Sequence, residues 1–309
     1  MSTNFAIIER QIITYCGIPI FVAGVIGGIL NIIVFLSLRT FRQSSCGLYL
    51  IVMSIFNIGH LFLALFYRIL TILSGVDVAA TSLFICKLRS FLAQICSATS
   101  MTCFCMATID QYFATCSRVR WQLWCNIKLS QRIIIISIII WILHGIPFLV
   151  FYNHVLSSIT NKITCISTNY IFDQYRIFVF ALGLVGYLAI IIGALFGSMA
   201  FYNVQQMAYR AVPLVRRELE KQLTVMVLVE VVVNILALLP YTTINAVSQN
   251  KNLTNNSFIQ AQIQFASPFY VYICASERFR KQLIYVLFEI HLNRWRRPRM
   301  IINQVIPDT

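Results

Sequence analysis

Residues 133–152 read IIIISIIIWILHGIPFLVFY, an uninterrupted stretch of twenty residues without a charged side chain. An α-helix needs about 20 apolar residues to cross the ~30 Å hydrocarbon core of a bilayer. Because lipid cannot hydrogen-bond to the backbone, a stretch of this kind is stable there only as a helix. Six more runs of similar character lie at about 12–38, 47–73, 84–115, 177–202, 223–247 and 258–275. The sequence therefore predicts an all-α membrane protein, a seven-transmembrane helix bundle.

The composition excludes an ordinary soluble domain. Hydrophobic residues make up 59% of the chain and charged residues 11%, whereas soluble domains average about 45–50% and ~25%. The chain has 309 residues and no long polar block, which leaves no room for a separate globular domain. We therefore expect a single membrane domain over residues 1–309.

The positive charge is concentrated in alternate gaps between the runs. Seventeen of the 24 lysines and arginines follow the first, third, fifth and seventh runs. Because cytoplasmic segments are enriched in Lys and Arg, this pattern predicts an extracellular N-terminus and a cytoplasmic C-terminus in the plasma membrane. The gap between runs six and seven holds N-x-S/T acceptors at Asn252 and Asn255. Their glycosylation requires the same orientation, with this loop outside.

The charges and cysteines also limit the partners. The net charge of +14 is distributed among the gaps, as membrane topology requires, so we do not expect nucleic acid as a partner. The ten cysteines include no CxxC pair, and no histidine-rich cluster has the spacing of a zinc site. We therefore expect neither a metal nor a cofactor.

The third run carries the most specific pattern. Its end reads Asp110-Gln111-Tyr112, and Gln111 follows Cys86 by 25 positions. This resembles the rhodopsin-like G-protein-coupled receptors, in which a disulfide cysteine begins the third helix and an Asp-Arg-Tyr triplet ends it at the same spacing. Gln111 replaces the arginine of that triplet. A polar helix end at the level of the lipid headgroups would explain the same three residues.

Other runs extend the resemblance along the chain. Asn31 matches the lone Asn of the family's first helix, Asn57 stands where the second helix usually has a buried Asp, and Ser100 lines the same internal site. Trp141 resembles the single Trp of the fourth helix. Pro240 resembles the proline that kinks the sixth helix.

The last run and the segment after it complete the pattern. Pro268 and Tyr272 resemble the family's Asn-Pro-x-x-Tyr motif, although the Asn is absent and the proline is one position early. Residues 277–290 mix basic with apolar side chains, which fits a short amphipathic eighth helix at the inner membrane surface. The chain thus resembles a divergent, invertebrate-type member of the family.

The resemblance implies a receptor, not an enzyme, that transmits an extracellular ligand to a heterotrimeric G protein by helix rearrangement. It implies a disulfide between Cys86 and Cys165. It places G-protein coupling at Asp110, Gln111, Tyr112, Arg216, Arg217 and Lys221. It places the activation core at Asn31, Asn57, Ser100, Glu230, Leu238, Pro240, Pro268 and Tyr272. Asn234 is expected to join the polar, water-bearing seam of this core.

The replacement of the triplet arginine changes one expectation. Gln111 cannot form the ion pair that usually joins the third helix to the inner end of the sixth. This leaves Asp110 to pair with Arg118 or Arg120, and it predicts higher basal activity.

Two further residues alter the core. Asn57 removes the main anionic ligand of a sodium ion, so we expect weak or no sodium sensitivity. Glu230 lies ten residues before Pro240, well inside the sixth run. It is either a switch element that contacts run three or run seven, or a carboxyl group satisfied by a neighbouring Asn or Tyr.

The ligand class is less constrained. Amine receptors carry an Asp at the position of Ala93, opsins need a Lys that residues 258–275 lack, and Leu238 replaces the family's toggle Trp. Cations with aromatic neighbours near the outer surface suit an anionic or amidated peptide, such as a neuropeptide. The same cations would also fit the headgroup boundary, and chemosensory ligands stay open. We expect the ligand pocket at Arg68, Ala93, Gln94, Tyr241 and Gln262.

Other classes of protein remain as alternatives. A small transporter would show internal repeats or paired broken helices, and the sequence shows no repeat. A membrane enzyme would need catalytic groups, yet His60 and His144 lie in different runs without an acidic motif at catalytic spacing. A receptor that binds without signalling is compatible with Gln111 and Leu238, because a fold does not establish an activity.

Overall fold

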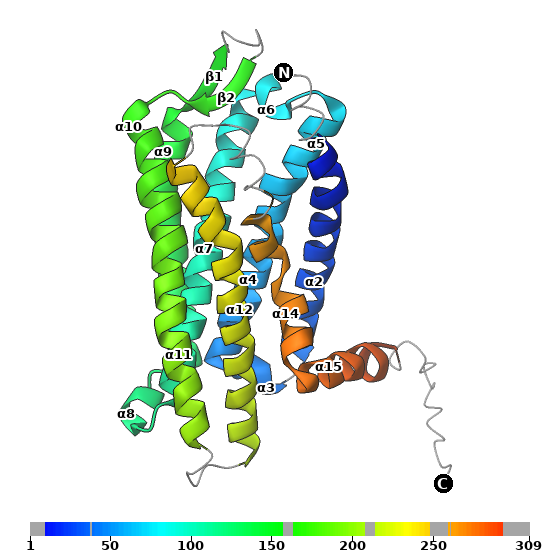
Figure 1. The fold of residues 1–309 in the computed structure, drawn as a ribbon, viewed down its shortest axis with the longest axis vertical. Coiled ribbons are helices and arrows are strands. Elements are labelled where there is room, and N and C mark those ends of the chain that lie inside the picture. Colours follow the sequence, from blue (N-terminus) through cyan, green and yellow to red (C-terminus); the bar gives the residue numbers. More distant parts are fainter. Residues whose placement is uncertain are drawn as a thin grey trace, which may run out of the picture.

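The computed structural model describes residues 10–37, 39–156, 163–207, 214–247, 259 and 261–292. Among them, six helical rods are long and apolar enough to cross a membrane. Figure 1 shows these rods side by side as one elongated bundle. Each rod coincides with one of the first six predicted runs: Arg10–Ser37, Ser45–Ser74, Leu83–Thr115, Ile127–Phe151, Tyr170–Gln206 and Glu220–Tyr241.

The first and second rods consist of consecutive helices. The first combines a π-helical turn, Ile13–Gly17, with α2 (Ile18–Ser37). The second combines α4 (Ser45–His60), a π-helical turn at Leu61–Phe66 and α5 (Tyr67–Ser74). Gly75 ends α5 in the left-handed conformation, with φ of 69°, which glycine adopts without steric cost.

The other four rods follow in the chain. The third and fourth are the single helices α7 (Leu83–Thr115) and α9 (Ile127–Phe151). The fifth comprises α10 (Tyr170–Gln174), a π-helical segment at Tyr175–Leu188, and α11 (Ala189–Met207). The sixth lies within α12 (Leu214–Val247), which contains Pro240.

The seventh predicted run is described only in part. Residues 261–266 are helical, Ser267 interrupts the helix, and α14 spans Pro268–Ala275. The interruption follows from Pro268, which lacks a backbone N–H and is favoured at the first position of a new helix. The described residues of this run are fewer than a membrane span needs, so the seventh span stays a prediction.

A further helix, α15 (Glu277–Ile284), follows α14 and continues as a π-helical segment at Tyr285–Leu292. Ser276 caps it, because the Ser276 hydroxyl accepts a hydrogen bond from the Phe279 amide at 3.1 Å. Phe279 is buried, whereas Arg280 and Lys281 are exposed. The segment is therefore helical and two-faced; its position at a membrane surface stays a prediction.

The two ends of the bundle differ. At one end, which we call the hairpin end, β1 (Tyr152–Leu156) pairs antiparallel with β2 (Ile163–Ser167), next to α6 (Val78–Thr81). At the other, which we call the opposite end, lie α3 (Arg39–Arg42), α8 (Val119–Gln122) and α15 (Figure 1). A disulfide joins Cys86, at the start of α7, to Cys165 in β2, with 5.8 Å between their Cα atoms. The implied disulfide is thus present.

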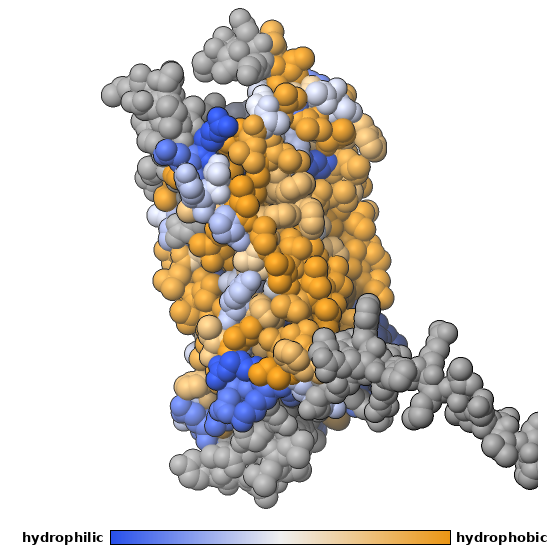
Figure 2. Space-filling view, turned by 90° about the vertical axis from the view of Figure 1, so that its right-hand side faces the viewer, coloured by the Kyte–Doolittle hydropathy of each residue, from blue (hydrophilic) through white to orange (hydrophobic). Residues whose placement is uncertain are grey.

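The flank of the bundle is apolar. On α9, isoleucines such as Ile135, Ile136, Ile139 and Ile140 are exposed. Figure 2 shows a broad hydrophobic belt between more hydrophilic ends. Soluble monomers rarely expose an apolar surface of this extent, so the belt is the lipid-facing surface of a multi-pass membrane protein.

Small residues allow the helices of the bundle to approach one another. A Cβ atom at Gly24 would lie 2.5 Å from Leu61 Cδ1 and 2.8 Å from Ala266 Cβ, and one at Gly27 would lie 2.9 Å from Phe269 Cβ. Contacts this short are not tolerated, so α2 packs against its neighbours only because these positions are glycine. This contact brings α2 against the helical residues at 261–266 and against α14.

Candidate functional site

A cavity of about 250 Å³ opens between the rods at the hairpin end. Its walls come from the second and third rods, β1, the fourth and fifth rods, α12 and the helical residues at 261–266. The aromatic side chains that line it are Phe148, Tyr152, Phe180, Tyr241 and Phe265. The polar ones are His60, Ser90, Gln94, Ser97, Gln262 and Gln264, together with two arginines. The cavity is therefore apolar-walled with a few convergent polar groups, as small-ligand sites are.

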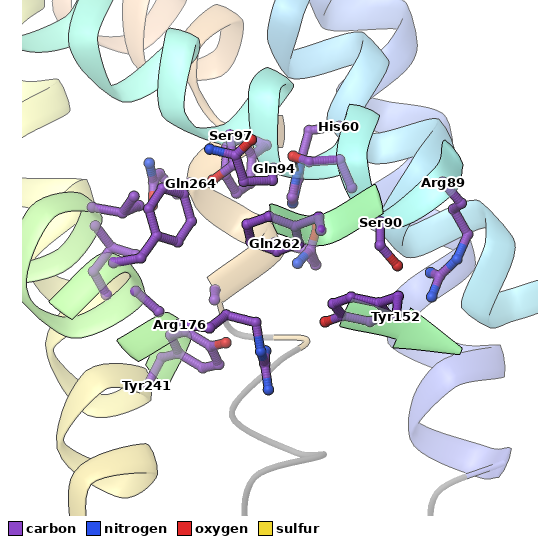
Figure 3. Close-up of a pocket in the computed structure, with 18 residues that line it drawn as sticks. His60, Arg89, Ser90, Gln94, Ser97, Tyr152, Arg176, Tyr241, Gln262 and Gln264 are labelled. Atoms are coloured by element: carbon purple, nitrogen blue, oxygen red, sulfur yellow. Dashed lines mark hydrogen bonds between the residues drawn. The ribbon is translucent and has the colours of Figure 1, made fainter. Parts of the chain in front are cut away.

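The two ends of the cavity carry different polar residues. Figure 3 shows His60, Gln94, Ser97 and Gln264 at one end, Tyr152, Arg176 and Tyr241 at the other, and Gln262 between them. Tyr152 belongs to β1, so its end of the cavity is the mouth, and the end with the amides is the deep end.

Both arginines of the cavity already have partners. The Arg176 guanidinium donates to Asp173 at 2.7 Å, as an ion pair within the fifth rod. The Arg89 guanidinium lies over the Tyr67 ring, 4.0 Å from its centroid, and donates to the Leu63 carbonyl at 3.4 Å. Arg89 still has an unpartnered Nε. The mouth thus carries positive charge that is largely committed to the protein.

The amides at the deep end are less well satisfied. Gln94 Nε2 lies 2.9 Å from His144 Nδ1, and Gln264 Nε2 donates to the Met101 thioether at 3.0 Å. The carbonyl oxygens of Gln94, Gln262 and Gln264 have no hydrogen-bond partner, although all three residues are at least nine-tenths buried.

The middle of the bundle holds a second group of buried polar residues. The Ser100 hydroxyl donates to the Asn57 side-chain oxygen across α7 and α4. The Ser267 side chain interacts with the Glu230 carboxyl, whose Oε2 has no partner. Ser267 lies in run seven, and Tyr272 of the same run also interacts electrostatically with Glu230.

Other core oxygens also lack partners. They are Asn31 Oδ1, Asn234 Oδ1 and the Tyr272 hydroxyl, all buried. Such atoms are usually satisfied by buried water. The water-bearing seam stays a prediction.

At the opposite end, Gln111 joins α7 to α12. Its Nε2 donates to Thr224 Oγ1 at 2.8 Å, to the Glu220 carbonyl at 2.9 Å and to Glu220 Oε2 at 3.0 Å. Gln111 is 1% exposed. A neutral side chain thus makes the contact between these helices that an arginine would make as an ion pair. We call this contact the Gln111 latch.

Asp110 has a different partner from the one we expected. Its carboxylate accepts a hydrogen bond from the Ser45 hydroxyl at 2.6 Å, and its backbone carbonyl lies 3.3 Å from Cys125 Sγ. Arg118 and Arg120 are exposed. The expected pairing with these arginines is therefore replaced by a contact with α4, because α7 buries the Asp110 side chain against Ser45.

Comparison with known proteins places this arrangement in a family. The model of the family described as "7 transmembrane receptor (rhodopsin family)" matches residues 27–276. The chain belongs to the rhodopsin family of seven-transmembrane receptors. No curated protein matches the receptor closely enough to name a relative.

The receptor's cavity includes four of the five expected pocket residues: Ala93, Gln94, Tyr241 and Gln262. Among the described residues, Arg68 does not line it. Arg89, on α7 of the third rod, lines it instead.

Sequence reasoning missed His60 and Gln264 as cavity residues. The signal that could have found both is the rule that polar residues inside lipid-spanning helices face the bundle interior. The rule does not say at which depth they lie, so it cannot separate a cavity residue from a core residue.

Some expectations lie beyond what the structure describes. Asn252 and Asn255 lie outside the described residues, and so do the side-chain positions of Arg216 and Arg217. Lys221 is described and exposed, one residue beyond Glu220. The coupling role of these basic residues therefore stays a prediction.

Proposed function

We propose that this receptor lies in the plasma membrane with its hairpin end outside, and that it transmits an extracellular ligand to a heterotrimeric G protein. The hairpin-end cavity is the ligand site, and a peptide is the ligand class that best suits it. The opposite end, with Asp110, Gln111, Tyr112, Arg216, Arg217 and Lys221, is the proposed G-protein surface. The whole chain acts as one receptor domain with seven spans and an eighth helix, α15.

The observation that carries this proposal is that one helix, α12, extends from the cavity to the Gln111 latch. Leu238 and Tyr241 of α12 line the cavity, whereas Thr224 and Glu220 of the same helix hold the Gln111 latch. The distance from Thr224 to Tyr241 along a helix is roughly 25 Å at 1.5 Å per residue. A ligand that prefers one position of the Tyr241 end therefore biases the contacts of Gln111 at the other end.

The buried residues between the two ends support a bundle with two states. Asn31, Asn57, Ser100, Glu230 and Tyr272 lie in the core, and several of their oxygens have no protein partner. Polar groups held this way can exchange partners at low cost when helices shift. Leu238, Pro240 and Pro268 lie where α12 and α14 border this region, and we propose that they belong to the same activation core.

A direct test uses the full chain co-expressed with a panel of G-protein α subunits and challenged with a peptide library. We expect at least one peptide to promote nucleotide exchange. Tyr241→Ala should lower that response at least tenfold, because Tyr241 lines the cavity. Tyr170→Ala is the matched control, since Tyr170 is 76% exposed on α10 and does not line the cavity.

If no subunit responds to any peptide, a receptor that binds without signalling becomes the better description. Gln111 in place of arginine is the observation that favours this second candidate. A response to volatile or small-molecule odorants alone would instead indicate a chemosensory receptor.

The orientation has its own test. An N-terminal epitope should be accessible to antibody on intact cells, and a C-terminal one only after permeabilisation. Treatment with an N-glycosidase should increase electrophoretic mobility, and the double substitution Asn252→Gln and Asn255→Gln should remove that change. The reverse accessibility would overturn the proposed orientation.

A further inference from the structure

Two glutamines, Gln264 at the deep end of the cavity and Gln262 between that end and the mouth, have amide groups that the protein leaves unsatisfied. Gln262 and Gln264 are each 2% exposed, both line the cavity, and both carbonyl oxygens lack a hydrogen-bond partner. A buried polar atom without a partner costs about 1–3 kcal/mol. Both residues line the same cavity, so a bound molecule that reaches these oxygens would supply the missing donors.

The nitrogen of Gln264 is also poorly matched. Its hydrogen-bond partner among the described residues is the Met101 thioether at 3.0 Å, and a thioether sulfur is a weak acceptor. Whichever way the amide is turned, Gln264 keeps both donor and acceptor capacity. The complement of an amide with both capacities is a planar group that offers an N–H and a C=O together.

Charge excludes the other common end groups. None of the described residues that line the cavity is an Asp or Glu, so an ammonium group would be buried without a counter-ion and near two arginines. A carboxylate would face the unpartnered oxygens of Gln262 and Gln264. It would also find Arg176 already paired with Asp173. The deep end therefore favours an uncharged group.

The size of the cavity limits how much of a ligand enters. Its volume of about 250 Å³ lies below the ~300–1,000 Å³ of pockets that bury a whole drug-sized ligand. Phe265 closes one wall and packs against His60, with 4.0 Å between the ring centroids. The cavity thus admits one end group together with one neighbouring side chain.

From these observations we infer that the cavity recognises a primary carboxamide between its middle and its deep end, through Gln262 and Gln264, with the neighbouring apolar side chain of the ligand against the aromatic walls. This inference rests on the proposed function only in taking the cavity as the ligand site. The carboxamide can come from the amidated end of a peptide or from an Asn or Gln side chain, and the test separates these sources.

The test measures binding of small probes to the purified full-length receptor in lipid nanodiscs, by saturation-transfer NMR. The first pair of probes is N-acetyl-phenylalaninamide and N-acetyl-phenylalanine, which differ only in carboxamide against carboxylate. A third probe, N-acetyl-glutamine benzyl ester, carries its primary carboxamide on the side chain. N-acetyl-phenylalanine methyl ester is the uncharged control without an N–H at that end.

We expect the phenylalaninamide to bind at least tenfold more tightly than the acid and the methyl ester. Gln262→Leu and Gln264→Leu should each reduce that preference to less than threefold. Gln282→Leu is the matched control, since Gln282 also has an unpartnered carbonyl oxygen but lies on α15, at the opposite end. It should leave the preference unchanged. Tighter binding of the glutamine ester than of the phenylalaninamide would assign the carboxamide to a side chain and would support the inference.

Equal binding of amide and acid, tighter binding of the acid, or no binding of any probe at millimolar concentration would overturn the inference. A preference that survives both glutamine substitutions would overturn it as well. Thermal unfolding of each variant shows whether it is folded. Because binding is measured without a G protein, failure of signalling with an intact amide preference would count against the proposed function alone.

Discussion

The Gln111 latch permits the most quantitative prediction. The Gln111 amide has two N–H groups, so it can make two well-formed hydrogen bonds among the three contacts with Glu220 and Thr224. A neutral hydrogen bond contributes about 0.5–1.5 kcal/mol, and one to a charged group about 1.5–3 kcal/mol. The latch therefore stabilises the closed contact of α7 with α12 by about 2 kcal/mol or more.

The perturbation is Gln111→Met, which keeps the length of the side chain and removes its hydrogen bonds. A loss of about 2 kcal/mol shifts a two-state equilibrium roughly thirtyfold, because each 1.4 kcal/mol is a factor of ten. While the open state stays a minor one, basal nucleotide exchange on the co-expressed G protein should rise by about this factor. Exchange is normalised to the amount of receptor at the cell surface.

Smaller changes should have graded effects. Thr224→Val removes one neutral hydrogen bond of about 1 kcal/mol, so basal exchange should rise roughly fivefold. Gln111→Arg restores the charged partner of Glu220 and should lower basal exchange below that of the natural sequence. The latch in the structure thus opposes the higher basal activity that the loss of the arginine suggested.

A matched control and a second measurement guard against other causes. Gln122→Met makes the same change at the same end, where Gln122 donates to the Cys116 carbonyl at 2.8 Å. It should leave basal exchange within twofold. Hydrogen–deuterium exchange at residues 220–227 should increase in Gln111→Met alone. If Gln111→Met leaves both the nucleotide exchange and the hydrogen exchange unchanged in a folded receptor, the latch does not hold the helices.

Three further outcomes are expected. Replacing sodium chloride with choline chloride should leave ligand affinity unchanged, since Asn57 offers no anionic ligand; a shift beyond threefold would contradict this. Cys86→Ser should destabilise the receptor by about 2–4 kcal/mol in detergent unfolding, and adding Cys165→Ser should cost no more, because either change breaks the same bond. Gly24→Val should lower stability by about 1–3 kcal/mol through overpacking. Gly183→Ala is its control, since a Cβ there meets only one backbone oxygen, at 3.4 Å, and equal losses would argue against close packing at Gly24.

The membrane helices could be predicted from single residues and their order. Residues 133–152, and the five other runs that the structure describes in full, became helices within a few residues of the predicted bounds at most ends. The fourth rod, a single α-helix, begins at Ile127, six residues before the predicted run. The fifth rod begins at Tyr170, seven residues before the predicted run, because α10 and a π-helical segment extend it toward the hairpin.

The candidate site could be predicted less well. Ala93, Gln94, Tyr241 and Gln262, which the sequence placed in a ligand pocket, all line the cavity. That a ligand binds there stays a prediction. Arg68 was not correctly placed, since a single residue of offset rotates a side chain by about 100° around a helix. The sequence of one helix does not show which residue of a neighbouring helix the rotated side chain contacts.

Three features of the sequence were therefore sufficient to predict a helical membrane protein of this family. They are the apolar runs, the charged gaps between them and the spacing from Cys86 to Gln111. They suffice because the bilayer thickness sets the length of each helix, and a misplaced polar residue would be exposed to hydrocarbon. Both constraints act on consecutive residues and can therefore be seen in the sequence. Only the tertiary structure decided the partners: Ser45 for Asp110, Glu220 and Thr224 for Gln111, and a cavity without an acid around Gln262. Some of those contacts join residues more than a hundred positions apart in the sequence. Side-chain packing between helices determines them, rather than any local pattern.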